Sequence, residues 1–152
     1  MLHQRIINDL KEALKSGNSF VAGTLRMILS SLHNREIEKR GKGLEETLSE
    51  EEIIEVLFKE SKKRKEAIEA FTKGNRDDLV QKETKELKII ENYLPQLLSE
   101  AEIEKIVNEV IEKMGTAEIK NFGRVMGETM KELKGKADAS AVSEIVKNKL
   151  KI

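Results

Sequence analysis

The sequence contains no cysteine, and it has one proline among its 152 residues. Without cysteine the chain cannot form a disulfide, a thiolate nucleophile, a Cys-ligated zinc site or an iron–sulfur cluster. Aromatic residues make up 3% of the chain, whereas strands are rich in aromatic side chains. The composition therefore favours helices, and it suits a reducing compartment.

Long apolar runs and an excess of charge of one sign are also missing. No run approaches the roughly 20 apolar residues of a membrane-spanning helix, and the N-terminus leads into amphipathic sequence instead of a signal peptide. Basic and acidic side chains number 28 each, so bulk positive charge does not hold this protein to nucleic acid. We therefore expect a cytoplasmic protein with no membrane partner and no DNA partner, whose basic surface is local.

Apolar spacing predicts helices along almost the whole chain. Leucine, isoleucine and valine recur every three or four residues, first from Leu2 to Leu14 and then from Val21 to Leu32. Ser49 and Ser99 each begin a capping box, in which a glutamate three residues later reaches back to the serine. The predicted helices cover residues 2–15, 21–39, 50–73, 76–94, 100–114, 122–134 and 139–150.

Turn and cap residues divide these helices into two groups. Asn75 is expected to cap the fourth helix and Asp138 the seventh. Pro95 disfavours helical geometry at Leu94, which makes it the best internal boundary. The sequence therefore predicts an all-α, multihelical fold, with a four-helix N-terminal domain (1–95) and a three-helix C-terminal domain (96–152).

Charge is unevenly distributed within the C-terminal group. Residues 117–152 carry eight basic and five acidic side chains, whereas residues 96–116 carry two and five. Local basic clusters of this kind neutralise phosphates and release counterions. Lysines near helix ends also interact favourably with the helix dipole and keep surfaces soluble, so both explanations stay open here.

The densest basic run is Lys62-Lys63-Arg64-Lys65, in the middle of the third predicted helix. Consecutive positions spread around a helix, so these four residues do not form one stripe. Glu60 lies one turn before Arg64 and is its expected ion-pair partner. We therefore predict a thin packed face and a solvated helix that projects into water, and no nucleic-acid patch.

No residue pattern supports autonomous catalysis. His33 and Glu36 share a helix face, but no second ligand pair accompanies them, so an exposed or core-edge histidine is expected instead of a metal ligand. Ser30 and Ser31 have no histidine-plus-acid arrangement beside them, and no glycine-rich phosphate loop follows a predicted strand. The sequence predicts no catalytic residue, no metal site and no cofactor.

Gly123 and Gly127 lie four residues apart in the sixth predicted helix, where each costs about 1 kcal/mol relative to alanine. This cost implies a close approach, either by another helix or by the backbone of a ligand. Helix packing is the favoured explanation. Arg124 and Lys131 lie on the same helix, where they can flank an approaching phosphate backbone.

These residues carry a resemblance to a known family. Phe122-Gly123-Arg124-Val125-Met126-Gly127, followed by Leu133-Lys134-Gly135-Lys136-Ala137-Asp138, resembles the C-terminal signature of the YqeY family. The same signature marks the related tail domain of GatB, the B subunit of the glutamine-dependent tRNA amidotransferase. Residues 74–79 and 91–99 resemble the middle motifs of the family, so the similarity covers essentially the whole chain. Ala139-Ser140 departs from the Gly-Lys that relatives often carry, which removes one lysine from this turn.

The resemblance implies an all-helical, two-part fold and a noncatalytic module that binds tRNA or assists tRNA-dependent amidation. The alternative is a scaffold that docks on an aminoacyl-tRNA synthetase or an amidotransferase. A further alternative is a carbon–nitrogen ligase activity inherited from the family, with glutamine as amido donor. The sequence shows neither a nucleotide site nor a nucleophile for this activity. The low aromatic content predicts recognition of RNA by shape and backbone. The residues expected to contact phosphate are Lys120, Arg124, Lys131, Lys134, Lys136 and Lys147.

Overall fold

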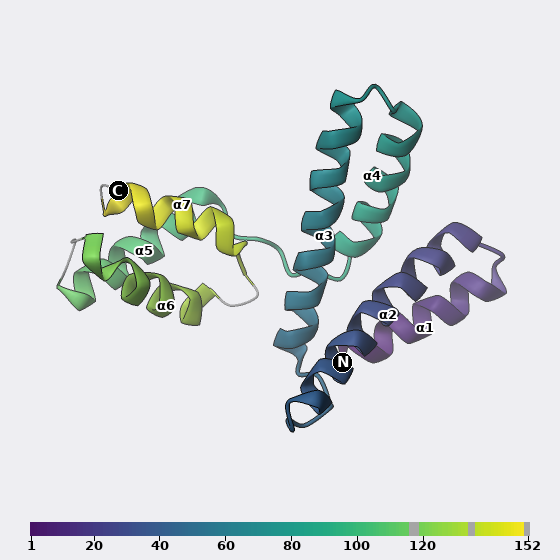
Figure 1. Cartoon of the computed structure of the whole chain (residues 1–152), viewed down its shortest axis with the longest axis horizontal. Helices are drawn as coiled ribbons and strands as arrows, with labels where there is room; N and C mark the ends of the chain where they lie inside the picture. The colour runs from purple at the N-terminus through teal and green to yellow at the C-terminus, as the bar shows by residue number, and fades with distance from the viewer. Residues whose placement is uncertain (116–118, 134–135, 151–152) are drawn as a thin grey trace. The chain divides into compact units, whose positions relative to one another are not determined.

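The computed structural model describes residues 1–115, 119–133 and 136–150. All regular structure in these ranges is helical, which confirms the all-α fold class (Figure 1). The elements are α1 (Leu2–Lys15), α2 (Ser19–Gly41), α3 (Glu50–Lys73), α4 (Asp77–Glu91), α5 (Glu100–Met114), the 3-10 turn η1 (Ile119–Asn121), α6 (Phe122–Leu133) and α7 (Ala139–Lys149). None of the described helices combines the length and apolar content needed to span a bilayer.

The chain divides into two compact units, Met1–Leu94 and Pro95–Ile152. The division falls at the proline, which disfavours a helical residue before it. For the same reason α4 ends at Glu91, three residues earlier than predicted, and the Tyr93 N–H bonds to the Ile90 carbonyl in a tight turn. That residues 1–95 and 96–152 are separate domains stays a prediction.

The first unit consists of two helical hairpins. α1 packs along α2, and α3 packs along α4 (Figure 1). Burying a leucine or isoleucine side chain contributes about 1.5–3 kcal/mol, so the shared core holds the two hairpins together. The buried residues of this core are Ile6, Leu25, Ile28, Leu32, Leu48, Ile53, Val56, Leu57, Ile90 and Tyr93. Away from this core the hairpins diverge toward their two turns (Figure 1).

Local caps fix the helix ends, and two of them differ from the prediction. The capping boxes at Ser49 and Ser99 are both present, as predicted. Asn75 does not cap α4, because it adopts a left-handed conformation (φ 55°) and Arg76 takes the cap position. Asp138 precedes α7 as predicted, but its side chain makes no capping hydrogen bond.

The second unit packs α5, α6 and α7 against one another. The connection from α6 to α7 is tied back to the start of the unit, because the Leu98 N–H donates to the Lys136 carbonyl at 2.9 Å. The helices thereby enclose a small apolar core. Its buried members are Ile103, Val107, Val110, Val125, Leu133, Ala137, Val142, Val146 and Leu150.

Candidate functional site

The outer face of α6 leaves two glycines open. Val125, Thr129 and Leu133 are fully buried on the inner side of this helix. Residues three or four positions apart share one face of a helix, and the opposite side of α6 is exposed. The exposed residues of this outer face are Gly123, Arg124, Gly127, Glu128 and Lys131.

The fold itself does not explain these glycines. Apart from the two chain neighbours of each glycine and the backbone of α6, no heavy atom of the described residues lies within 4 Å of the position that a β-carbon would take at Gly123 or Gly127. Helix packing, the favoured explanation from the sequence, is therefore not found among the described residues. Close approach by a bound molecule stays a prediction. Each glycine still lowers helix stability by about 1 kcal/mol relative to alanine.

A carboxylate lies between the two cations of this face. Lys131 Nζ lies 2.8 Å from Oε1 of Glu128, and this hydrogen bond and the charge of Lys131 lower the pKa of Glu128. The charge of Arg124 lowers that pKa further. An approaching phosphate must therefore compete with Glu128 for Lys131.

The other predicted phosphate contacts lie toward the two ends of α6. Lys120 is exposed in η1, immediately before α6. Lys147 on α7 places its Nζ 6.0 Å from the centroid of the Phe122 ring, where α6 begins. Lys136 is exposed in the connection that follows α6, and Lys134 lies outside the described residues. The structure thus brings only part of the predicted set onto one face.

A second charged cluster lies in the first unit, and the sequence does not predict it as a site. The Arg64 side chain is 5% exposed, and its Nη1 donates to Oε2 of Glu60 at 2.7 Å and to the Glu60 carbonyl at 3.1 Å. The predicted ion pair is therefore confirmed. The prediction of a solvated helix is wrong at Arg64, because Glu86 on α4 lies beside it, with Oε2 3.3 Å from Arg64 Nε.

Glu60 is held as a carboxylate in this cluster. Burial alone raises its pKa, but hydrogen bonds from Arg64 and Lys63, the charge of Lys63 and a hydrogen bond from Ser31 lower it, and the pKa lies below its usual value. Ser31 Oγ donates to Glu60 Oε1 at 3.1 Å. A carboxylate with a lowered pKa is a poor general base, so this arrangement does not activate the serine as a nucleophile.

His33 on α2 is exposed, in agreement with the prediction, whereas its neighbour Glu36 is partly buried. His33 Nδ1 lies 3.2 Å from Oε2 of Glu36, and the histidine side chain is 63% exposed. Among the residues that the structure describes, no group of three His, Asp or Glu side chains is placed to hold a metal ion.

Comparison with known proteins finds relatives along the whole chain. A family model described as Yqey-like protein matches residues 3–150. Similar proteins carry the name "Altered inheritance of mitochondria protein 41, mitochondrial". The one from Lachancea thermotolerans is 39% identical over 108 residues, which cover 70% of this chain and 56% of that relative. The one from Kluyveromyces lactis is 32% identical over 151 residues, which cover 94% of this chain and 78% of that relative.

These relatives contradict the predicted cytoplasmic location, because each is named as a mitochondrial protein. The prediction rested on the lack of cysteine and of long apolar runs, and on the amphipathic pattern of the first residues. Those absences suit any reducing aqueous compartment, which is why the composition did not distinguish one compartment from another.

Proposed function

The chain belongs to the Yqey-like protein family, and we propose that it is a noncatalytic helical module that binds structured RNA, above all tRNA, through the outer face of α6. The observation that carries this proposal is the open pair Gly123 and Gly127, beside the exposed Arg124 and Lys131. A phosphate backbone can approach the helix closely at these glycines, where no side chain holds it off. The resemblance to the tail domain of GatB supports the choice of tRNA.

The chemistry of this face suits a sugar–phosphate backbone better than bases. Arginine and lysine neutralise phosphates and release counterions, which gives a salt-dependent affinity. Double-stranded RNA presents phosphates and 2′-hydroxyl groups across its shallow minor groove, and proteins recognise it there mostly by shape. Because aromatic residues are 3% of the chain, base stacking contributes little to recognition.

The test is a titration of the purified full chain with tRNA at several salt concentrations, in which fluorescence anisotropy measures binding. Gly127→Ala tests the close approach of the RNA backbone to α6. The added methyl group fits the protein itself, because the space at this position is open and a helix tolerates alanine. We expect the substitution to weaken tRNA binding about tenfold while it stabilises the helix by up to about 1 kcal/mol. Gly41→Ala, at another open glycine in α2, is the matched control and leaves binding unchanged.

A second pair of variants tests the cations. Lys131→Ala should weaken binding and reduce the slope of log affinity against log salt by about one. Lys105→Ala removes an exposed lysine from α5 and should leave both unchanged. The absence of tRNA binding at low salt, or equal binding by the wild type and both α6 variants, contradicts the proposal. Transfer of ammonia onto mischarged tRNA by the lone chain would instead establish the ligase alternative.

A further inference from the structure

A groove runs along one side of α2 in the first unit. It consists of three hollows of about 260, 560 and 240 Å³. The first two share Met27 and Glu86, and the last two share Ser31, Glu60 and Lys63, so the hollows lie next to one another. We call this surface the α2 groove.

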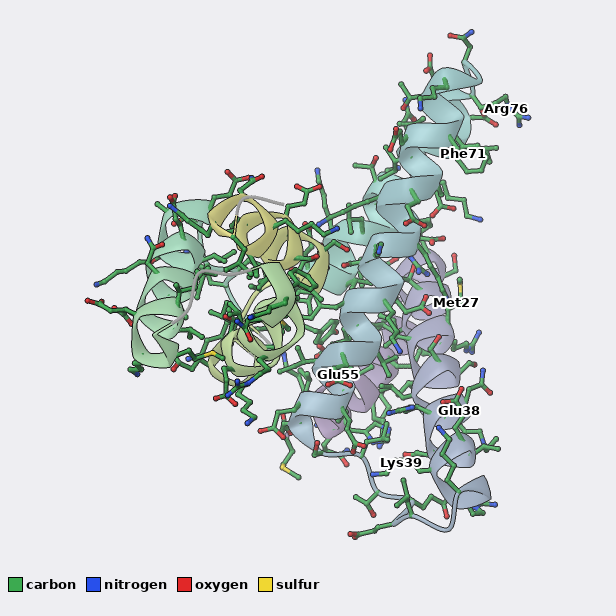
Figure 2. All side chains as sticks on the ribbon, turned by 60° about the vertical axis from the view of Figure 1, so that its left-hand side comes forward. Met27, Glu38, Lys39, Glu55, Phe71 and Arg76 are labelled. Atoms are coloured by element: carbon green, nitrogen blue, oxygen red, sulfur yellow. The ribbon has the colours of Figure 1, made fainter. Side chains whose placement is uncertain are left out.

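The α2 groove has the length of a helix. Its residues on α2 are Ser19, Phe20, Gly23, Thr24, Arg26, Met27, Ser30, Ser31, Asn34, Arg35 and Glu38. They recur every three or four positions, and at 1.5 Å per residue they extend over roughly 30 Å. Figure 2 shows Met27 and Glu38 along α2, which runs beside α3. α3 and α4 supply the residues that face α2 across the groove.

Part of the groove is apolar and unoccupied by the chain. Met27 is 49% exposed and Phe20 is 37% exposed, although both side chains are large and hydrophobic. Gly23 lies between them in the sequence, and beyond its own helix backbone and chain neighbours no heavy atom in the described part of the chain comes within 4 Å of the position that a β-carbon would take there. Complete burial of such a side chain contributes about 1.5–3 kcal/mol, so a partner that covers this end gains affinity from it.

The groove is also basic in a chain with no net charge. Its charged residues are Arg26, Arg35, Lys59, Lys63, Arg64 and Lys82 against Glu38, Glu60, Glu83 and Glu86. Four of these cations contact carboxylates of the groove itself. Arg35 contacts Glu38, Arg64 contacts Glu60 and Glu86, Lys63 contacts Glu60, and Lys82 contacts Glu86. The other two cations, Arg26 and Lys59, are exposed, and acidic groups on a partner match them.

We propose that the α2 groove docks an amphipathic helix of a partner protein, with its apolar side on Phe20 and Met27 and acidic side chains along its edges. The long, narrow shape, the apolar end and the basic surplus together fit this mode of recognition. RNA fits less well, since exposed apolar side chains and the carboxylate of Glu83 line the surface. This surface lies in the unit that the proposed RNA-binding face does not use, so either proposal can fail alone.

The chain has five methionines, so methionine methyl signals can show which surface a peptide binds. Methyl-labelled methionine in the full chain reports the groove through Met27, while Met126 and Met130, which pack against the core of the second unit, serve as internal references. The probe is a synthetic amphipathic helix of about five turns, with leucines on one face and glutamates on both edges. A second peptide carries lysines in place of the glutamates.

The acidic peptide is expected to shift the Met27 methyl signal and to leave the Met126 and Met130 signals in place. The lysine peptide should bind about tenfold more weakly or worse. Met27→Glu should weaken the acidic peptide about tenfold. Ile37→Glu is the matched control, because Ile37 is 47% exposed on the same helix but lines none of the three hollows. It should change the affinity by less than about twofold.

Any one of three results overturns the proposal: a Met27 signal that stays in place at saturating peptide concentration, equal binding of the two peptides, or equal effects of Met27→Glu and Ile37→Glu. A titration with tRNA tests whether the groove binds RNA instead of a protein helix. If tRNA shifts Met27 and the acidic peptide does not, the groove is an RNA surface and the docking of a protein helix is excluded.

Discussion

Arg64 on α3 lies beside Glu86 on α4, with its Nε 3.3 Å from Oε2 and with 5% and 6% of the two side chains exposed. The contact joins the two helices of the second hairpin at the floor of the α2 groove. Replacing Arg64 by alanine removes the shared cation between two buried carboxylates, Glu60 and Glu86. We expect Arg64→Ala to lower the free energy of unfolding by about 3–5 kcal/mol, measured by urea denaturation followed by circular dichroism.

The neighbouring residue provides the control for this substitution. Lys65 is exposed on the same helix, and Lys65→Ala should change the free energy of unfolding by less than about 0.5 kcal/mol. A cost of less than about 1 kcal/mol for Arg64→Ala would show that the buried cluster contributes little to the fold.

The lowered pKa of Glu60 predicts the pH dependence of stability. Because the folded-state pKa lies below the usual value of 4.5, the unfolded chain binds more protons than the folded chain in this range. The contribution of Glu60 to the free energy of unfolding is therefore fully present above about pH 4.5 and is lost as the pH falls through the folded-state pKa. Urea denaturation between neutral and acidic pH should show this loss in the wild type.

Glu60→Gln removes the titrating group and tests this assignment. The variant should be less stable than the wild type at neutral pH, because Lys63 loses its anionic partner and Arg64 loses one of its two. Its stability should then fall less steeply on acidification. Parallel pH profiles for the two proteins would assign the acid sensitivity to other carboxylates.

Two helix starts were predictable from the sequence because their signal lies within four residues. The capping boxes at Ser49 and Ser99 need only a serine and a glutamate three residues later, and both form as predicted. Asn75 misled the prediction, because asparagine suits both a cap and a left-handed turn. Here Asn75 takes the turn conformation, Arg76 occupies the cap position and the helix begins at Asp77.

The buried cluster and the open face needed the tertiary structure. The run around Arg64 indicates a solvated surface when only its own helix is considered, since its neighbours are nearly all charged. Its burial depends on Glu86, which another helix brings to it. The glycines of α6 signalled a close approach, but their spacing does not distinguish an internal helix from an external partner. Only the coordinates show that Gly123 and Gly127 are open within the described chain.

The single tyrosine of the chain reports the contact between α1 and the end of α4. Tyr93 Oη donates to Oδ2 of Asp9 at 2.5 Å, and burial, followed by this hydrogen bond, raises the pKa of Tyr93 well above its usual value of 10. The folded state therefore holds the proton more tightly than the unfolded state. Its contribution to stability is present below pH 10 and is lost as the pH rises above that value.

The absorbance of tyrosinate measures the ionisation of Tyr93 alone, because the chain has no other tyrosine and no tryptophan. We expect ionisation well above pH 10 in buffer and near pH 10 in concentrated urea. Asp9→Asn should lower the pKa of Tyr93 in the folded chain, because the acceptor loses its negative charge. Ionisation near pH 10 in the folded wild type, with the helical signal intact, contradicts the contact.

The boundary at Pro95 predicts that each unit folds by itself. Each has its own apolar core, with Ile28 and Leu57 in the first and Val107 and Val142 in the second. Residues 1–94 and 95–152, expressed separately, should give amide spectra that superimpose on those of the full chain away from the junction. The second fragment is small for a single core, so its helical signal should melt at a lower temperature than that of the first. An unfolded second fragment would show that the two units depend on each other for stability, and the proposed RNA-binding face would then need the whole chain.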